Sequence, residues 1–147
     1  MLVHKGRCRT IYAYRGVDGQ APALQFLGSL PEEVRARYVL HFKDMCENGQ
    51  VGGKFGHTLA SKNHKDCRGL GEFKDNQSQT RVLYFTEGSP GALMLSHGFG
   101  GKKEDQLSET EIARAKRTRD EYATRKPAAF ARARNALVRT SGGRKAR

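Results

Sequence analysis

Three short apolar segments, separated by turn residues, constrain the fold more than any other feature of the chain. They cover residues 69–75, 80–87 and 91–99 and have the length and composition of β-strands. Residues 76–79 (Asn-Gln-Ser-Gln) and 88–90 (Gly-Ser-Pro) supply the turns between them. Because strands joined by such short connections pair with their neighbours in the chain, we expect an antiparallel meander.

The residues before the meander predict, in chain order, a strand, two helices and a long loop. Residues 8–15 are rich in β-branched and aromatic side chains and predict the strand. Apolar residues at helical spacing predict a short helix near 21–28. Residues 49–68 are polar and glycine-rich without a clear period, so we expect a long loop there.

The further helix is predicted directly after the first one. Ser29 and Glu32 have the spacing of a capping box, in which each side chain bonds the other residue's backbone N–H. An apolar stripe with the helical period then runs from Val34 to Cys46, and Asn48-Gly49 is a typical helix end. The two helices therefore form a predicted helical hairpin.

A last helix is predicted after the meander, from a second capping box at Ser108 and Glu111 to about Lys126. Its apolar face is thin and consists of Ile112, Ala115 and Tyr122. A further basic helix is expected near 128–138, and the last nine residues are expected to be disordered. The elements together predict an α+β fold: a small antiparallel sheet packed with a helical hairpin and a C-terminal helix, plus a basic helical or disordered extension.

Positive charge is concentrated at the end of the chain. The formal net charge is +12; residues 1–111 hold 15 basic and 13 acidic side chains, whereas residues 112–147 hold 12 basic and 2 acidic ones. Cationic surfaces attract polyanions, so nucleic acid or the ribosome is the expected partner, the alternative being a tail that only keeps the protein in solution. The sequence has no apolar stretch of membrane-spanning or signal-peptide type, so we expect a cytoplasmic protein without a membrane partner.

Metal and nucleotide chemistry find little support in the sequence. The three cysteines, an odd and sparse set, are interpreted as structural thiols. Four residues of the zinc-ligand type match no usual finger spacing: Cys46, His57, His64 and Cys67. Both Gly-Lys pairs lack the earlier glycine and the following Ser or Thr of a phosphate loop. We therefore expect neither a metal nor a cofactor.

The predicted strands carry the residues that could do chemistry. Strand periodicity places Arg81, Leu83 and Phe85 on one sheet face and Val82 and Tyr84 on the other. By the same rule, four residues of the last strand are predicted to share a face: Leu93, Leu95, His97 and Phe99.

Basic side chains are predicted to gather around the ends of these strands. Lys74 ends one strand, and the glycine-rich segment 98–101 brings Lys102 and Lys103 to the end of the last. Such a cluster could hold an RNA phosphate and stabilise the charge of its transition state, with the RNA's own 2′-hydroxyl as nucleophile. His97 has the pKa range to move protons near neutrality. The alternatives are solvated surface charges and, for His97, a packed core histidine.

Residues 69–122 resemble the HigB/RelE-type toxins of type II toxin–antitoxin systems, specifically their phage-derived host-inhibition branch. The residues that carry the resemblance are Gly69-Leu70-Gly71-Glu72-Phe73-Lys74, Arg81-Val82-Leu83-Tyr84-Phe85, Leu95-Ser96-His97-Gly98-Phe99-Gly100-Gly101-Lys102-Lys103 and Glu111-Ile112-Ala113-Arg114-Ala115. The preceding strand and helical hairpin occur in the expected order, so the likeness covers about residues 8–123. It implies a RelE/ParE-like toxin domain over residues 1–123, followed by a basic extension over 124–147.

The resemblance implies an endoribonuclease that enters the ribosomal A site, cuts mRNA through the 2′-hydroxyl and is neutralised by a cognate antitoxin. By position, Arg81 resembles the arginine that grips the scissile phosphate, Lys74 a basic residue of the preceding strand, and Lys102 or Lys103 the basic pair after the last strand. We add His97 to this predicted catalytic set. RNA binding is expected of six further residues: Arg68, Arg114, Arg117, Arg119, Arg125 and Lys126.

The sequence departs from this family near the start of the last helix, where many members place a tyrosine or histidine. Residues 106–109 read Gln-Leu-Ser-Glu here, with Glu104 and Asp105 close by. His97 or a residue of 49–68 could substitute, or the protein could cut weakly. Two other functions stay open on the same fold: a non-catalytic nucleic-acid-binding or regulatory protein, and a topoisomerase-inhibiting toxin.

Overall fold

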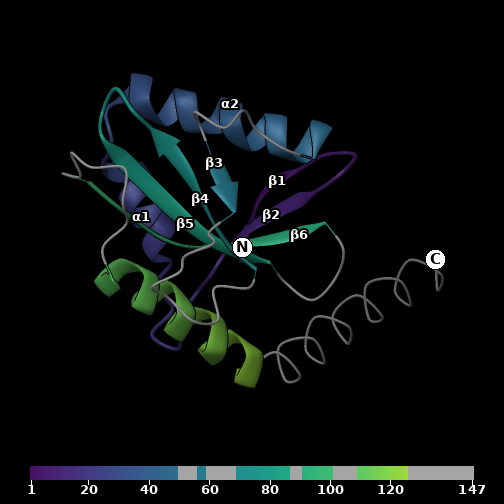
Figure 1. Cartoon of the computed structure of the whole chain (residues 1–147), viewed down its shortest axis with the longest axis vertical. Coiled ribbons are helices and arrows are strands. Elements are labelled where there is room, and N and C mark those ends of the chain that lie inside the picture. Colours follow the sequence, from purple (N-terminus) through teal and green to yellow (C-terminus); the bar gives the residue numbers. More distant parts are fainter. Residues whose placement is uncertain (50–55, 59–68, 87–90, 101–108, 126–147) are drawn as a thin grey trace, which may run out of the picture.

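The computed structural model describes residues 1–49, 56–58, 69–86, 91–100 and 109–125. These residues form one mixed sheet with helices on both faces, so the predicted α+β class is confirmed (Figure 1). The strands are β1 (Leu2–Lys5), β2 (Thr10–Ala13), β3 (Gly56–Thr58), β4 (Leu70–Asp75), β5 (Thr80–Thr86) and β6 (Ala92–Phe99), and the helices are α1 (Pro22–Ser29), α2 (Glu32–Asn48) and the helical residues 109–125.

The strands follow the order β1-β2-β6-β5-β4-β3 in the six-stranded sheet. The meander of β4, β5 and β6 is antiparallel, as predicted. The expectation of a wholly antiparallel sheet is wrong, because β2 pairs with β6 in parallel. Parallel strands need a long crossover connection, and here α1 and α2 begin that connection across one face of the sheet.

Two strands lie outside the predicted elements, and one predicted cap is wrong. β1 forms a hairpin with β2, and β3 lies within the segment expected to be a loop. Pro31, rather than Ser29, is the N-cap of α2, and the Ser29 hydroxyl donates to the Phe26 carbonyl oxygen at 2.7 Å. The predicted end of α2 is confirmed, because Gly49 adopts a left-handed conformation there, with φ of 82°.

Each face of the sheet has its own apolar core. Residues of α1 and α2, among them Tyr38 and Phe42, pack with Phe73, Val82 and Tyr84 on one face. On the opposite face, Leu70, Leu83, Phe85 and Met94 pack against Ile112, Ala115 and Tyr122. The predicted thin apolar face of the last helix is therefore confirmed for residues 109–125. Ser108, the predicted cap, and the expected basic helix near 128–138 lie outside the described residues.

A β-bulge in β6 changes which residues of that strand share a face. Leu83 pairs with His97 but the next residue, Tyr84, pairs with Leu95, so Ser96 is an extra residue. The alternation along β6 is therefore shifted by one. Leu95 faces α1 and α2, whereas His97, like Leu83, faces residues 109–125. The predicted shared face of Leu93, Leu95, His97 and Phe99 is thus wrong for its last two members.

Candidate functional site

The sheet face that meets residues 109–125 brings three of the predicted catalytic residues together. Opposite partners in antiparallel strands point to the same face, and the helical residues 109–125 cross this face in Figure 1. The register aligns nine residues of β4, β5 and β6 in three rows: Leu70, Phe85 and Met94; Glu72, Leu83 and His97; Lys74, Arg81 and Phe99. Lys74, Arg81 and His97 therefore lie in two adjacent rows.

Arg81 forms a buried ion pair with a carboxylate of the neighbouring strand. Its Nη1 atom lies 3.0 Å from Oε2 of Glu72, and the two residues are 6% and 1% exposed. Removing either partner would leave a buried charge uncompensated, which is strongly destabilising. The arginine that was predicted to grip a phosphate is thus bound to an internal anion in this conformation.

His97 lies between two oxygen atoms in the interior. Its Nε2 atom is 2.6 Å from Oε2 of Glu111, and its Nδ1 atom is 2.8 Å from the Ser96 hydroxyl. Burial lowers the pKa of His97, although the hydrogen bond that its ring donates to Glu111 partly opposes this effect. The neutral ring carries one proton, and because the Glu111 carboxylate can only accept, that proton lies on Nε2. The Ser96 hydroxyl then donates to Nδ1.

These groups combine the elements of metal-free phosphoryl chemistry. Arg81 and the half-buried Lys74 can neutralise phosphate charge, while His97 and the two carboxylates can exchange protons. In this conformation Glu72 binds Arg81 and Glu111 binds His97, and these are the two side chains that a substrate phosphate would need. A phosphate would therefore have to replace these carboxylates.

Glu72 and Glu111 were not predicted as site residues, although the sequence contained a signal for Glu72. Strand periodicity places Glu72 between Leu70 and Lys74 on the buried face, where a carboxylate needs a cationic partner. Glu111 was assigned to a helix cap and to a stretch that carries the family resemblance, but not to the site. Its pairing with His97 depends on the β6 bulge, which no local pattern indicated.

Among the other predicted residues that the structure describes, Arg114 lies close enough to His97 for its positive charge to lower the pKa of that histidine. Lys102 and Lys103 lie outside the described residues, as do Arg68 and Lys126. Arg114 and Arg117 are exposed on the helical residues 109–125, and Arg119 lies 3.3 Å from Asp120. Arg125 instead connects this helix to the sheet: its Nη1 atom donates to the Tyr14 hydroxyl at 3.0 Å, and its guanidinium lies 5.8 Å from the centre of that ring.

Comparison with known proteins finds no match, either to a protein-family model or to a curated protein. Within the part of the chain that the structure describes, no group of three or more His, Cys, Asp or Glu side chains is placed to hold a metal ion. None of the described helices has the length and apolar character to cross a membrane. Function must therefore be inferred from the site and from the sequence.

Proposed function

We propose that this protein is a ribosome-dependent mRNA endoribonuclease, the toxin of a toxin–antitoxin pair. The observation that carries the proposal is the alignment of Lys74, Arg81 and His97 on one face of the meander. The described elements also support a RelE/ParE-like fold. Apart from β1 and β3, their order is one strand, two helices, three strands and a helix, which is the order that the sequence resemblance implies.

The proposed reaction uses the RNA's own 2′-hydroxyl and needs few protein groups. The 2′-oxygen attacks the adjacent phosphorus, and neutral His97 accepts the hydroxyl proton at Nε2. For this step the substrate displaces Glu111 and the ring proton moves to Nδ1, from which it is donated to the Ser96 hydroxyl oxygen. The bond from phosphorus to the 5′-oxygen breaks, and the leaving oxygen takes the proton back from the imidazolium. Arg81 and Lys74 neutralise the charge on the non-bridging oxygens. The products are a 2′,3′-cyclic phosphate and a 5′-hydroxyl end.

A second function is favoured by the burial of the same residues. Arg81 and His97 are 6% and 1% exposed, and each is bound to a carboxylate of the chain. A protein that uses this cluster only to stabilise its fold would bind nucleic acid without cutting it. The exposed Arg114 and Arg117, together with the basic residues that follow, would then supply the binding surface.

The deciding experiment is induced expression followed by mapping of mRNA 5′ ends. Arg81→Lys is preferred to Arg81→Ala, because it keeps a cation beside the buried Glu72 carboxylate. Lys74→Ala tests the second cation, and Lys43→Ala, an exposed lysine of α2, is the matched control. We expect the wild type and the control to arrest growth and cut translated codons. Arg81→Lys should lower cleavage about 100-fold, the typical effect of removing one charge-stabilising donor.

Three results would contradict the nuclease proposal. Intact mRNA during growth arrest points to another target, and intact mRNA with damaged DNA points to a topoisomerase. Unchanged cleavage in a stably folded Arg81→Lys variant removes Arg81 from the site. The folding of each purified variant is checked by thermal unfolding followed by circular dichroism.

A further inference from the structure

The outer side of α2 carries apolar residues that the described part of the chain leaves uncovered. The side of the helix that meets the sheet is buried, and Tyr38 and Phe42 belong to it. On the outer side, Val39 and Leu40 are 52% and 60% exposed. Adjacent exposed apolar residues bordered by charged ones are typical of a surface that contacts another protein.

Four exposed residues of this side lie in one stripe along the helix. The steps between them are four, three and four residues, so their mean spacing is close to one helical turn. Two helices that pack side by side in a coiled coil use this spacing. We call the stripe the outer seam, and it consists of Glu32, Ala36, Val39 and Lys43.

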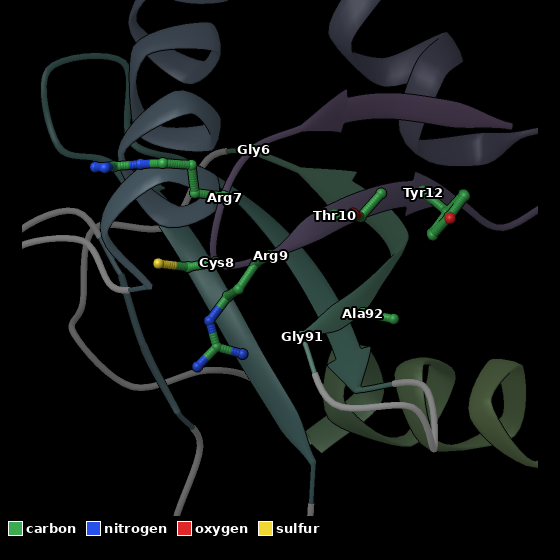
Figure 2. Close-up of a pocket in the computed structure, with 8 residues that line it drawn as sticks. All are labelled: Gly6, Arg7, Cys8, Arg9, Thr10, Tyr12, Gly91 and Ala92. Atoms are coloured by element: carbon green, nitrogen blue, oxygen red, sulfur yellow. The ribbon is translucent and has the colours of Figure 1, made fainter.

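The outer seam belongs to a helix that is held firmly on the body of the protein. At one end, the turn after β1 closes on α2, because the N–H groups of Cys8 and Arg9 donate to the Cys46 carbonyl oxygen at 2.8 and 3.0 Å. Figure 2 shows this turn at the pocket that it lines. Nearer the other end, Arg37 donates to the Asp75 carboxylate of β4 at 2.7 and 2.9 Å. A surface that is already held in this way loses little conformational entropy on binding.

The outer seam is complementary to itself when a second copy of the helix runs in the opposite direction. In that arrangement Ala36 faces Val39 of the second copy in the centre, and Glu32 faces Lys43 of the second copy at each end. In a parallel arrangement, each charge would face its own kind and be repelled. Within the described residues, neither Glu32 nor Lys43 forms an ion pair, and about 16 Å of helix separates the two. Both charges are therefore available to a partner.

We infer that two copies of this chain associate through the outer seams of α2, with the two helices antiparallel. A two-fold axis then makes each contact twice, which is the usual symmetry of a homodimer. The seam spans about three helical turns, so the contact is small and the dimer forms only at high protein concentration. The inference does not depend on the proposed function.

The candidate site lies away from this contact. α2 covers one face of the sheet, whereas Lys74, Arg81 and His97 lie on the face that meets the helical residues 109–125 (Figure 1). In the dimer, the two candidate sites therefore point away from each other. Dimerisation and RNA cleavage can accordingly be measured separately.

Sedimentation equilibrium with the full chain tests the association. The protein is studied between about 10 µM and about 1 mM, the range in which small interfaces dissociate. Salt at about 0.15 M screens the repulsion between exposed charges that lie more than about 8 Å apart. We expect the weight-average mass to rise with concentration from that of one chain toward that of two. Larger species are not expected, because the two-fold contact uses the seam of both copies.

Exchange of the two seam charges tests the direction of the helices. Lys43→Glu places carboxylates opposite each other at both ends of the seam and should weaken dimerisation at least about fivefold. Glu32→Lys places ammonium groups there and should have the same effect. The double variant restores opposite charges and should dimerise within about twofold of the wild type. A parallel dimer would respond to neither single exchange, because like charges would face each other before and after it.

Val39→Glu tests the apolar centre of the seam. It adds a carboxylate opposite Ala36 of the second copy, where the contact would bury it without a partner, so dimerisation should weaken at least about tenfold. Asp44→Lys is the control, because it changes the charge of an exposed residue of α2 outside the seam and should leave dimerisation as in the wild type. Thermal unfolding followed by circular dichroism checks that each variant folds.

The mass of a single chain over the whole concentration range would overturn the inference. A dimer with wild-type affinity in both Lys43→Glu and Val39→Glu would also overturn it, since its contact would lie elsewhere. Failure of the double exchange to restore dimerisation would contradict the antiparallel arrangement. A full chain that stays monomeric, while deletion of residues 127–147 allows dimerisation, would show that the basic end rather than a second copy controls the seam. None of these results depends on whether the protein cuts RNA.

Discussion

His97 shows how strongly one residue's chemistry depends on its surroundings. On a solvent-facing position, its imidazole would titrate near pH 6.5. Here the ring is 1% exposed, and burial lowers its pKa. The Glu111 carboxylate and the nearby Arg114 guanidinium act in opposite directions on the protonated form, and Glu111 also fixes the proton on Nε2. His97 can therefore accept a substrate proton at Nε2 only after the substrate has replaced Glu111 and the ring proton has moved to Nδ1.

The lowered pKa predicts that the protein loses stability in mild acid. Below about pH 6.5 the unfolded chain binds a proton at this histidine, whereas the folded chain resists it. The free energy of unfolding should thus fall as the pH decreases from 6.5 toward the folded pKa, by up to about 1.4 kcal/mol per pH unit. His97→Gln keeps an N–H donor for Glu111 but does not titrate, so its slope should be shallower. Urea unfolding at several pH values between 5 and 8, followed by circular dichroism, measures both slopes.

His41 is the matched control for this experiment. It is also buried, and burial lowers its pKa, but it lies on α2 and faces the other core. His41→Gln should therefore keep the part of the slope that comes from His97. Parallel slopes for the wild type and His97→Gln would show that the folded protein binds this proton as readily as the unfolded chain does.

At the scale of elements, local patterns predicted the meander and α2. They did not predict the features that depend on residues far apart in the chain, namely the bulge in β6 and the parallel pairing of β2 with β6. The strands around Arg81 and Leu83 were predictable because turn residues bound them on both sides. The bulge at Ser96 was not, since an extra residue is defined only against the partner strand. The parallel pairing of β2 with β6 likewise depends on where the chain returns after α2. At Ser29 a capping pattern was present, but Pro31 took the cap position.

Some residues of the candidate site could likewise be predicted from the sequence, whereas others could be found only from the tertiary fold. Lys74 was predicted only at the end of the strand next to Arg81, and the register pairs the two residues directly on one face. His97 was predicted to share a face with Leu93 and Leu95, and the bulge instead places it on the other face, with Lys74 and Arg81. Two residues were chosen from their basic character; the acidic partners that make burial possible, Glu72 and Glu111, needed the tertiary fold.

Arg37 and Asp75 join α2 to the end of β4, and this contact predicts a second acid-sensitive contribution to stability. The arginine donates from Nε and Nη2 to the two carboxylate oxygens at 2.7 and 2.9 Å. This pairing, helped by Ser78, lowers the pKa of Asp75 to about 2. A lowered carboxyl pKa stabilises the fold above about pH 4 and loses this effect as the pH falls toward 2.

Asp75→Asn should accordingly lower the free energy of unfolding by about 2 kcal/mol at pH 7. The difference from the wild type should shrink below pH 4 and vanish only below about pH 2, because protonated Asp75 resembles asparagine in charge. Asp44→Asn, an exposed position on α2, serves as the control and should change little. Urea unfolding at pH 7 and at pH 3 decides the matter; a difference of the same size at both values would assign the effect to packing instead.

The whole molecule combines a nearly neutral body with a strongly basic end. Residues 1–111 carry a net charge of +2, and residues 112–147 carry +10. The proposed chemistry lies on the sheet, so the basic end would serve mainly to hold a polyanion near it. Under the binding-protein alternative, the same basic end would itself be the functional part. The two functions therefore differ in how much they depend on residues beyond the described helix.

Deletion of residues 127–147 separates these functions without disturbing the contact of Arg125 with Tyr14. The deletion removes six basic side chains and no acidic ones. If these charges contact RNA, the slope of log affinity against log salt should fall by up to about 4, because each single-strand phosphate contact contributes about 0.7. Fluorescence anisotropy with a labelled RNA at several salt concentrations measures that slope.

A nuclease whose site lies on the sheet should still cut at the same codons in the mapping experiment, at a lower rate. Loss of all cutting from a truncated protein that unfolds at the wild-type temperature would place the essential contacts in the basic end and count against the sheet as the place of reaction.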